Sequence, residues 1–478
     1  MNTVSRAVAG RQSRLHPSIT LSVGNGHVDL LHPAWGGYRL RGLRDDTLAA
    51  LRALADGASL VPSAGSALVR LLERLPHLVV HVAGGAAGRP LLIATPVTRA
   101  ARLADARSTG HLRLSRYAYL RPLPETDTAV IESPLSGYRL TVAEPAVAAL
   151  LTAEFEPDRP APGLTSEEVT EVAGLLAATG MLADVDTEHV RSRWEFHDLL
   201  FHTRSRYGQH DYPGGGVYLH AGTRPPPQPV LPTEPGIDLP VPDWDRVLAA
   251  DPPLSEVLES RRSVREYDQA PVTIEQLGEL LYRAARVRRV GQLDISLPHA
   301  YQAVSRPFPS GGGLGELELY VTVVRCAGLE PGIYHYDPAG HRLVSRPHDP
   351  GARTELVQQA YVATGGSLAA PQLVFTVTSR LDRISWKYAT IAYALALKHV
   401  GVLYQTMYLV ATAMGLAPCA FGSGDSEVAA RAIGLDWIEQ PAVGEFAIGS
   451  RRAADLAPSA DQYRDLVRET RGVIGGGA

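Results

Sequence analysis

The chain has 478 residues, of which 45% are hydrophobic and 20% charged, and its formal net charge at pH 7 is -4. This composition is typical of a soluble globular protein with two or three domains. The near balance of charge argues against broad contact with nucleic acid or an anionic membrane surface, so any anionic ligand must be held by local charge.

The chain has two cysteines, Cys326 and Cys419, far apart and without metal-ligand spacing. We therefore expect neither a disulfide framework nor a bound metal, and a reducing cytoplasm fits best. The N-terminus is basic but lacks the apolar region of a secretory signal. Residues 400–424 are uncharged and long enough to span a membrane, but they contain Gln405, Pro418 and a Gly/Ser-rich end, which favours a buried core helix.

The tetrapeptide GYRL occurs twice, at residues 37–40 and 137–140. Each copy is followed by two helical patterns and a strand pattern, and in the second copy Thr165 with Glu168 predicts a capping box, with Gly180 as the helix end. The order predicts tandem winged-helix-like α+β modules over residues 1–110 and 111–190. The alternative is a single α+β domain in which the repeated tetrapeptide is a coincidence.

Residues 191–243 form a predicted joining segment whose last part, residues 223–243, is rich in proline and therefore an extended connector. Its histidines His197 and His202 are five residues apart, so they do not share a helical face as metal ligands would.

Residues 244–478 alternate helix and strand patterns, which predicts a layered α+β domain. Thr273 with Gln276 marks a helix start. Continuous apolar runs predict strands buried on both faces at residues 317–326 and 372–379, and a final strand is expected at residues 442–450. A single long helix is predicted over residues 385–414.

Four motifs in this domain are candidates for ligand binding. ESRRSVREY contains Arg261, Arg262, Ser263 and Arg265, RPFPSGGGLGELELY contains Pro309, Ser310 and Gly311, AFGSGDSE contains Gly422, Ser423 and Gly424, and AIGSRRA contains Arg451. Clustered guanidinium groups suit a phosphate, and glycines let backbone N–H groups approach a ligand closely. Taken singly, each is equally consistent with a solvated basic helix end or a flexible turn.

Together, the order of these motifs resembles the flavin-binding nitroreductase fold, and more narrowly the SagB-type or McbC-type dehydrogenases of thiazole/oxazole-modified peptide biosynthesis. The resemblance covers about residues 254–452 and includes SRRSVREY, FPSGGGLGELELY, SWKYATIAY and MYLVATAMGLAPCAFGSG; FHTRSR at residues 201–206 resembles the joining segment of longer SagB-type proteins.

The resemblance implies FMN bound at the interface of a homodimer. By motif, the phosphate and ribityl groups would be held by Arg261, Arg262, Ser263, Arg265 and Arg451. The edge of the isoalloxazine would lie along Pro309, Ser310 and Gly311, and its other face near Gly422, Ser423 and Gly424.

The stretch ISWKYATIAY places Lys387 next to Tyr388 at the head of the predicted long helix. If Ser385 caps that helix, both residues lie in its first turn, where the helix dipole would lower both pKa values. By itself the pattern is more typical of an exposed lysine beside a packed aromatic. In McbC-like dehydrogenases, however, a catalytic Lys-Tyr pair occupies this place in the motif order, and the electrostatics leave open which residue is the base.

The function implied by the resemblance is FMN-dependent oxidation of thiazoline or oxazoline rings to thiazole or oxazole in a ribosomally made precursor peptide. The Cα proton would pass to a base and the Cβ hydride to flavin. The N-terminal modules would recognise the leader peptide, and a cyclodehydratase complex is an expected partner. Two other readings are an NAD(P)H-dependent nitroreductase or flavin reductase, and a non-catalytic scaffold that docks a cyclodehydratase.

Overall fold

A computed structural model describes most of the chain, and its contacts divide the chain into two compact units, residues 1–214 (unit 1) and 215–478 (unit 2). The described residues are 12–59, 61, 66–85, 88–104, 112–123, 128–151, 161–184, 193–211, 215–220, 235–293, 300–366 and 370–453. Most of the proline-rich connector lies outside them.

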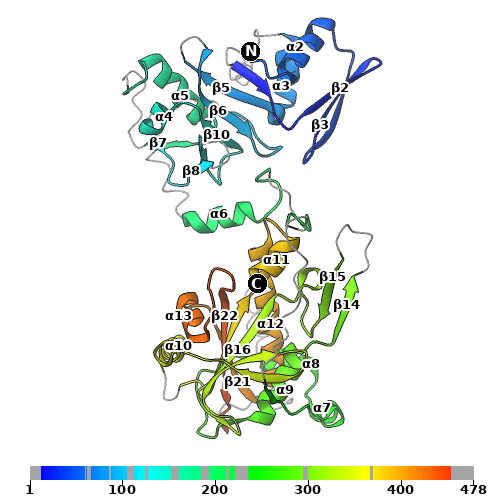
Figure 1. Ribbon diagram of the computed structural model, residues 1–478, viewed down its shortest axis with the longest axis vertical. Coiled ribbons are helices and arrows are strands. Elements are labelled where there is room, and N and C mark those ends of the chain that lie inside the picture. The colour runs from blue at the N-terminus through cyan, green and yellow to red at the C-terminus, as the bar shows by residue number, and fades with distance from the viewer. Residues whose placement is uncertain are drawn as a thin grey trace, which may run out of the picture. The chain divides into compact units, whose positions relative to one another are not determined.

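Unit 1 contains two successive sets of strands and helices (Figure 1). The first set is β1 (Gln12–Leu15), β2 (Thr20–Gly24), β3 (His27–His32), β4 (Gly36–Arg41), α2 (Asp45–Ala55), α3 (Ala67–Arg74), the short 3-10 helix η1 (Pro76–Leu78), β5 (Val79–Gly84) and β6 (Pro90–Pro96). The second is β7 (Leu112–Leu114), β8 (Tyr119–Leu123), β9 (Thr128–Glu132), β10 (Tyr138–Val142), α4 (Pro145–Leu150), α5 (Ser166–Ala178) and β11 (Leu182–Asp184), and it is followed by α6 (Phe196–Arg204).

The two sets repeat one topology. In the first, the antiparallel strands β2, β3 and β4 are followed by two helices and by β5, which pairs with β1. In the second, β8, β9 and β10 are followed by two helices and by β11, which pairs with β7. The two GYRL copies lie at β4 and β10, the fourth strand of each set, with Gly137 directly before β10.

Strands of both repeats meet in one six-stranded sheet, ordered β1-β5-β6-β10-β9-β8. The α+β class with a sheet-rich N-terminal part is confirmed, while winged-helix modules with boundaries near residues 110 and 190 stay a prediction.

The capping box predicted at the start of α5 is confirmed: Glu168 N donates to Thr165 Oγ1 at 3.2 Å and Thr165 N donates to Glu168 Oε2 at 3.0 Å. Gly180 follows the helix with φ 74°, as a C-terminal stop requires.

Unit 2 is built around a seven-stranded sheet, ordered β12-β19-β18-β16-β20-β22-β21. Its strands are β12 (Ile237–Asp238), β13 (Val272–Thr273), β14 (Arg289–Leu293), β15 (Tyr301–Ser305), β16 (Leu317–Val323), β17 (Cys326–Ala327), β18 (Gly332–Asp337), β19 (Arg342–Ser345), β20 (Leu373–Ser379), β21 (Leu416–Phe421) and β22 (Ala442–Ser450). Its helices are α7 (Trp244–Ala250), α8 (Leu254–Ser260), α9 (Ile274–Ala285), the 3-10 turn η4 (Gly311–Gly313), α10 (Pro350–Ala363), α11 (Leu381–Lys387), α12 (Ala392–Ala413) and α13 (Ser426–Ile433).

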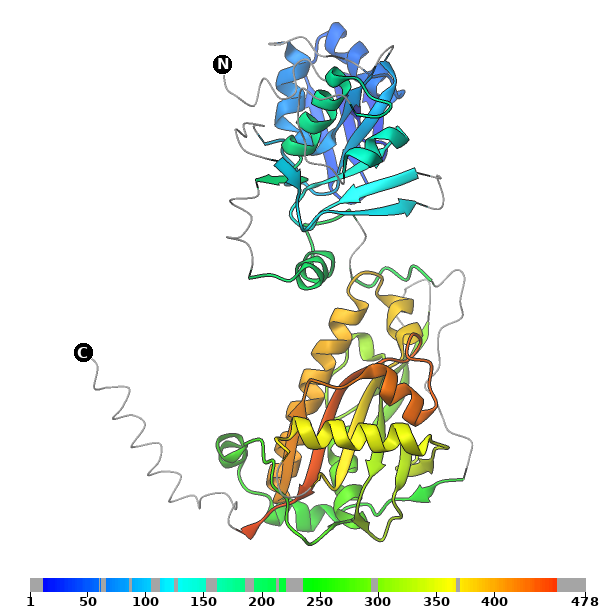
Figure 2. The same ribbon diagram turned by 90° about the vertical axis from the view of Figure 1, so that its left-hand side faces the viewer.

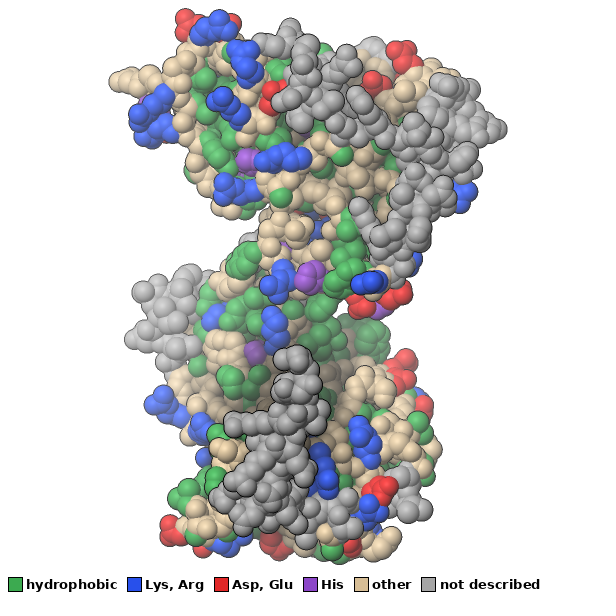
Figure 3. All heavy atoms as spheres, turned by 180° about the vertical axis from the view of Figure 1, so that it is seen from behind, with side chains coloured by type: hydrophobic (Ala, Val, Ile, Leu, Met, Phe, Trp, Pro, Cys, Tyr) green, Lys and Arg blue, Asp and Glu red, His purple; other side chains and the backbone are tan. Residues whose placement is uncertain are grey.

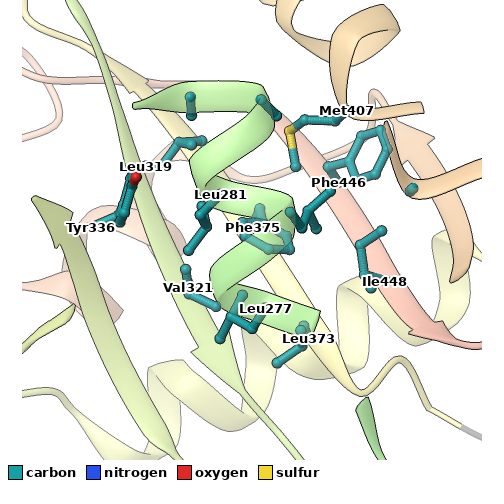
Figure 4. Packing of buried hydrophobic residues seen from close by; sticks show 14 of the residues in the cluster. Leu277, Leu281, Leu319, Val321, Tyr336, Leu373, Phe375, Met407, Phe446 and Ile448 are labelled. Atoms are coloured by element: carbon teal, nitrogen blue, oxygen red, sulfur yellow. The ribbon is translucent and has the colours of Figure 1, made fainter. Parts of the chain in front are cut away.

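Helices cover both faces of this sheet, which explains the continuous apolar runs. Every residue of β16 and β20 is buried. On one face Leu319 and Phe375 pack with α9 and α12 (Figure 4), and on the other Tyr320 and Val374 pack with α10 and α13 (Figure 2). A strand between two helical layers has no solvent face, so both predictions of strands buried on both faces are confirmed. The capping box at the start of α9, Thr273 with Gln276, is confirmed as well.

The prediction of one helix over residues 385–414 is wrong. Helix α11 ends at Lys387, Tyr388 has the extended angles φ -114° and ψ 112°, and α12 begins only at Ala392. The cause is a distant segment: Gly216 bridges Tyr388, and Tyr218 N donates to the Lys387 carbonyl at 3.1 Å. This pairing uses the carbonyl that a continuing helix would need, so the chain turns before α12 starts.

Residues 400–424 are not one helix either, since they run from α12 into β21. Gln405 lies on the exposed side of α12. Within the described part of the chain, no helix is both long enough and apolar enough to cross a membrane. On the face drawn in Figure 3, acidic and basic side chains are interspersed with apolar and other atoms.

Candidate active site

Lys387 lies at the centre of a cluster of tyrosines in unit 2. Its Nζ donates a 2.8 Å hydrogen bond to Tyr301 Oη on β15. The same atom is 4.9 Å from the ring centre of Tyr301, 5.4 Å from that of Tyr388 and 5.6 Å from that of Tyr218. Three electron-rich rings and a phenol oxygen surround the ammonium group, and each stabilises its positive charge.

The electrostatic prediction for the pair is wrong, because the two residues end a helix instead of beginning one. Burial lowers the pKa of Lys387, but the hydrogen bond with Tyr301 and the surrounding phenol oxygens outweigh it and raise the pKa above its ordinary value. Burial raises the pKa of Tyr388, and the ammonium of Lys387 only partly opposes this. The negative end of the α11 dipole also favours the charged lysine.

The glycine turn predicted to contact a ligand lies directly against this cluster. Tyr301 Oη donates to the Gly312 carbonyl at 2.7 Å. A Cβ atom added to Gly312 would lie 2.5 Å from Lys387 Nζ and 3.1 Å from Tyr388 Oη, and one added to Gly311 would lie 3.4 Å from Tyr388 Oη. A side chain at Gly312 would therefore have to displace the Lys387 ammonium, and the structure brings Lys387 and Tyr388 together with this turn.

A buried histidine, His399, hydrogen-bonds the glycine turn and is itself held by a buried glutamate, Glu316. Gly311 N donates to His399 Nε2 on α12 at 2.8 Å, so that nitrogen is the acceptor and Nδ1 carries the hydrogen. Nδ1 donates to Glu316 Oε1 at 2.5 Å. Glu316 is fully buried and His399 is 7% exposed, which makes this a fixed support.

Ser310 is part of the same support. Its hydroxyl oxygen accepts from Gly315 N at 3.1 Å, and its carbonyl accepts from Gly313 N at 3.1 Å. The hydroxyl hydrogen of Ser310 is thus not needed for the Gly315 bond and can be donated to a ligand. Pro309, which precedes it, is exposed.

The arginine-rich motif forms an extended segment that follows α8. Val264 N donates to the Pro418 carbonyl at 2.8 Å and Asp268 N to the Ser450 carbonyl at 3.0 Å, so the segment runs beside the ends of β21 and β22. Arg451 immediately follows Ser450. The motifs around residues 261–265 and 451, far apart in sequence, are therefore neighbours in the fold.

Gln372 joins the ends of these two motifs. Its Oε1 accepts from Val272 N at 2.7 Å and Ser450 N at 3.2 Å, and its Nε2 donates to the carbonyls of Asp268 at 2.9 Å and Ala270 at 3.0 Å. The side chain is 1% exposed. A buried amide with every partner satisfied fixes the position of the backbone beside Arg451.

The third motif, residues 422–424, is an exposed turn between β21 and α13. A Cβ atom on Gly424 would lie 2.1 Å from the Glu445 carboxyl, whose pKa is raised to about 7 by burial and lowered somewhat by the Gly424 backbone N–H. Tyr404 on α12 borders the same carboxyl, and burial first and this carboxyl second raise the pKa of its phenol. The glycine is required here by close approach and not by a left-handed backbone.

Helix α12 connects all of these places. His399 contacts the glycine turn, Tyr404 lies at Glu445, and Tyr408 hydrogen-bonds Ser263 Oγ at 2.8 Å and Ala420 N at 2.7 Å while Arg261 lies over its ring at 5.1 Å. From residue 399 to 408 a helix rises about 13 Å. Sequence reasoning missed these three residues; their signal was a stripe of polar-tipped side chains within an apolar helix.

The chemical groups at these positions are of the kinds that would bind the flavin implied by the resemblance. Guanidinium groups of Arg261, Arg262, Arg265 and Arg451 lie on neighbouring segments and suit a phosphate, and the glycine turn admits the close approach of a flat ring.

His197 has a side chain 79% exposed to solvent. Among the described residues, no group of three or more His, Cys, Asp or Glu side chains is arranged to hold a metal ion.

Comparison with known families and structures matches two parts of the chain. Residues 258–450 match the nitroreductase family model, and residues 112–211, the second repeat of unit 1 with α6, match the model of the cyanobactin oxidase ThcOx. A curated candidate nitroreductase of Methanocaldococcus jannaschii, MJ1384, is 30% identical over 170 residues, which is 36% of this chain and 78% of that protein.

Two solved structures are similar to part of this chain. A candidate nitroreductase from Ralstonia eutropha is 24% identical, with a TM-score of 0.35, over 48% of this chain and 95% of that one. The Escherichia coli microcin synthetase McbBCD complex, solved with truncated pro-MccB17, contains a chain that is 18% identical, with a TM-score of 0.35, over 49% of this chain and 82% of that one.

Proposed function

Because this chain belongs to the nitroreductase family, we propose that unit 2 is an FMN-dependent oxidoreductase that converts thiazoline or oxazoline rings of a ribosomally made precursor peptide to thiazoles or oxazoles. The observation that carries the proposal is the contact of Lys387 and Tyr388 with the turn Gly311–Gly313. The proposed proton-transfer groups would thus lie beside the turn that the motif order assigns to the flavin edge. The match of residues 112–211 to a cyanobactin oxidase supports an oxidase acting on a peptide.

FMN, when bound, supplies a two-electron acceptor for a hydride. Arg261, Arg262, Ser263, Arg265 and Arg451 would hold its phosphate and ribityl groups. Pro309, Ser310 and Gly311 would border one edge of its ring system, and residues 422–424 its other face. Gln372 and His399 keep the two ends of this site in place through backbone bonds.

Aromatisation of an azoline removes the Cα proton and the Cβ hydride, so one side chain must take a proton. Burial opposes the protonated form of Lys387, but the hydrogen bond with Tyr301 and the surrounding phenol oxygens outweigh it, which makes Lys387 a poor base. We assign the base to Tyr388 acting as its phenolate: burial raises the pKa of the phenol, the adjacent Lys387 ammonium partly opposes that rise, and the phenolate would accept the Cα proton. Lys387 then acts as a fixed cation and as the donor that holds Tyr301 on the Gly312 carbonyl.

The repeats of unit 1 would bind the leader peptide or a partner such as a cyclodehydratase. A homodimer of unit 2 would cover apolar side chains on the outer side of α12. Leu397 and Val402 are each 38% exposed there, and Gln405, one turn after Val402, is exposed as well. Exposed apolar stripes of this kind are typical of protein interfaces.

The test is incubation of the yellow, flavin-loaded chain with a thiazoline-containing peptide in the presence of dioxygen, followed by mass spectrometry. Wild type should remove two hydrogens from each ring. Tyr388→Phe and Lys387→Ala should retain the flavin absorption but lose roughly 10²–10⁴-fold in rate. Lys398→Ala is the matched control, because Lys398 is exposed on α12 and is the other lysine of the chain. Full turnover by both site variants would overturn the proposal.

Two further measurements separate the roles of the pair. Lys387→Arg should keep a measurable part of the rate if the lysine is a cation and none if it is the base. Selective ¹⁵N labelling of the two lysines should show the Lys387 ammonium persisting above pH 9, with Lys398→Ala assigning the signals.

A second candidate function, an NAD(P)H-dependent nitroreductase, is favoured by the 30% identity to the Methanocaldococcus jannaschii protein. Rapid oxidation of a nicotinamide with a nitroaromatic acceptor, without any mass change in the azoline peptide, would select it. A purified chain without a flavin band would instead indicate a scaffold.

A further inference from the structure

Residues 215–218 lie against the pair Lys387 and Tyr388, although they belong to none of the motifs assigned to the flavin. Gly216 pairs with Tyr388 in an isolated antiparallel bridge. Two residues further along the chain, Tyr218 N donates to the Lys387 carbonyl at 3.1 Å. One short segment from the start of unit 2 therefore contacts both residues of the pair.

The backbone of this segment determines where the Tyr388 side chain points. Neighbouring residues of an α-helix point about 100° apart, so Lys387 and Tyr388 would diverge if α11 continued through them. The bridge with Gly216 holds Tyr388 in extended angles instead. Both side-chain tips now approach one point, since a Cβ atom on Gly312 would lie 2.5 Å from Lys387 Nζ and 3.1 Å from Tyr388 Oη. The two groups converge at the glycine turn because the helix is interrupted.

The side chain of Lys387 lies between two glycines from distant parts of the chain. A Cβ atom on Gly216 would lie 3.2 Å from Lys387 Cε and 3.7 Å from its Cγ, so the backbone there packs on the aliphatic part of the lysine. Gly312 makes the corresponding contact with the ammonium group. A side chain at either glycine would press on the lysine.

Tyr218 has a backbone conformation that is unusual for a bulky residue. Its φ is 52°, in the left-handed region, and among the described residues other than glycine only His341 also has a positive φ. This conformation is unfavourable for a tyrosine, so the contacts of the residue must hold it in place. The ring meets buried Trp386 edge-on, with centroids 5.4 Å apart and planes at 87°, and its centre lies 5.6 Å from Lys387 Nζ. The strained backbone thus brings an electron-rich ring to the ammonium group.

We propose that Tyr218 is a positioning residue of the active site: its ring and its backbone N–H hold Lys387, while the adjoining bridge at Gly216 turns Tyr388 toward the same point. This role rests on the proposed function, in which Lys387 and Tyr388 act on the azoline ring. Tyr218 acts through these two residues and not on the substrate. Its loss should therefore slow the reaction of bound substrate without weakening the binding of substrate or FMN.

The experiment uses the full, flavin-loaded chain with variants of residue 218. Tyr218→Gly removes the ring but keeps the N–H, and glycine adopts the left-handed backbone without strain. Its kcat with a thiazoline peptide should fall about tenfold, while KM and the dissociation constant of FMN should change less than about twofold. Tyr218→Phe keeps a ring beside the ammonium and should retain the wild-type kcat within about twofold.

Gly216→Ala tests the same segment independently, because its methyl group would press on Lys387 Cε. Its kcat should fall about threefold. Tyr361→Leu is the matched control and should oxidise the peptide like wild type. Tyr361 is a half-buried tyrosine on α10 whose hydroxyl donates to the Gly366 carbonyl at 2.9 Å.

A second readout requires neither flavin nor turnover. With ¹⁵N-labelled lysine, the chain gives side-chain signals from Lys387 and from the exposed Lys398. Near pH 6 the ammonium protons of Lys387 should exchange slowly with water, because the group is hydrogen-bonded to Tyr301 and surrounded by rings. Tyr218→Gly should speed this exchange about tenfold, and Tyr218→Phe should leave it unchanged.

A rise in KM without a fall in kcat would overturn the inference, because it would place Tyr218 on the substrate. Equal losses of kcat and FMN affinity in Tyr218→Gly would also overturn it, since they would indicate a structural role alone. A wild-type chain with slow Lys387 exchange and no azoline oxidation would refute the proposed function alone. Azoline oxidation at the wild-type rate by Tyr218→Gly, with unchanged Lys387 exchange, would refute this inference alone.

Discussion

The two glycine turns of unit 2 are held in different ways, although the motif order assigns both to the flavin. The turn at Gly311–Gly315 is held by three hydrogen bonds, with the His399 ring, the Tyr301 phenol and the Ser310 hydroxyl. The turn at residues 422–424 meets a single buried carboxyl, Glu445, whose pKa is about 7. The contact of the second turn therefore changes with the protonation of Glu445 near neutral pH.

The glycines themselves are needed for different reasons. Gly312 and Gly313 both have φ 63°, a left-handed conformation that disfavours a side chain. Gly424 is needed because the Glu445 carboxyl occupies the place of a side chain. Three substitutions test how far this comparison holds.

The largest effect is expected for His399→Leu, which leaves both Gly311 N and the buried Glu316 without their partner. Unfolding free energy should fall by about 3 kcal/mol, and affinity for FMN should fall with it. Denaturant titration and flavin fluorescence measure the two quantities. His335→Leu is the matched control, because His335 forms a second buried pair with Glu318, at 3.1 Å, on β18 and β16. The His335→Leu variant should lose comparable stability but keep its FMN affinity. If both variants lost FMN affinity equally, the contact of His399 with the first turn would have no specific role in FMN binding.

The next effect is the pH dependence due to Glu445. Its folded pKa lies above the ordinary value of 4.5, so between pH 4.5 and 7 the native chain binds more protons than the unfolded one. Its stabilising contribution is present at low pH and is lost as pH rises through 7, a change of up to about 3 kcal/mol. Unfolding of wild type and Glu445→Gln at pH 5 and pH 8 should show a smaller decrease in the variant. Glu427→Gln, an exposed carboxyl on α13, should keep the wild-type decrease; identical profiles for all three chains would refute the assignment.

The smallest effect on stability is expected for Gly312→Ala. The left-handed backbone should cost about 1–2 kcal/mol, and the added methyl group must displace Lys387 Nζ. The melting temperature should therefore drop slightly while azoline oxidation drops strongly. Gly291→Ala is the control, because Gly291 lies on β14 with open space at its Cβ position. Activity preserved in Gly312→Ala would show that the lysine position is not critical.

Local patterns predicted much of unit 2 and the repeat in unit 1. The apolar runs of β16 and β20, the capping boxes at Thr165 and Thr273, and the equivalent GYRL strands all depend on residues a few positions apart. The order of the binding motifs was also readable in the sequence. The roles of Lys387, Tyr388 and the cofactor residues remain predictions for the experiments above.

The sequence by itself determined which segments become strands and helices, because burial periodicity and capping are short-range properties. Only the tertiary structure decided where the long helix breaks, since the pairing of Tyr388 with Gly216 joins segments separated by most of unit 2. It also decided the environment of the reactive groups: His399 meets Glu316 and Gly311 across more than eighty residues, and Lys387 meets Tyr301. A pKa depends on such long-range neighbours, so the predicted lowering for Lys387 and Tyr388 was reversed once the fold placed three tyrosines and a helix end around them.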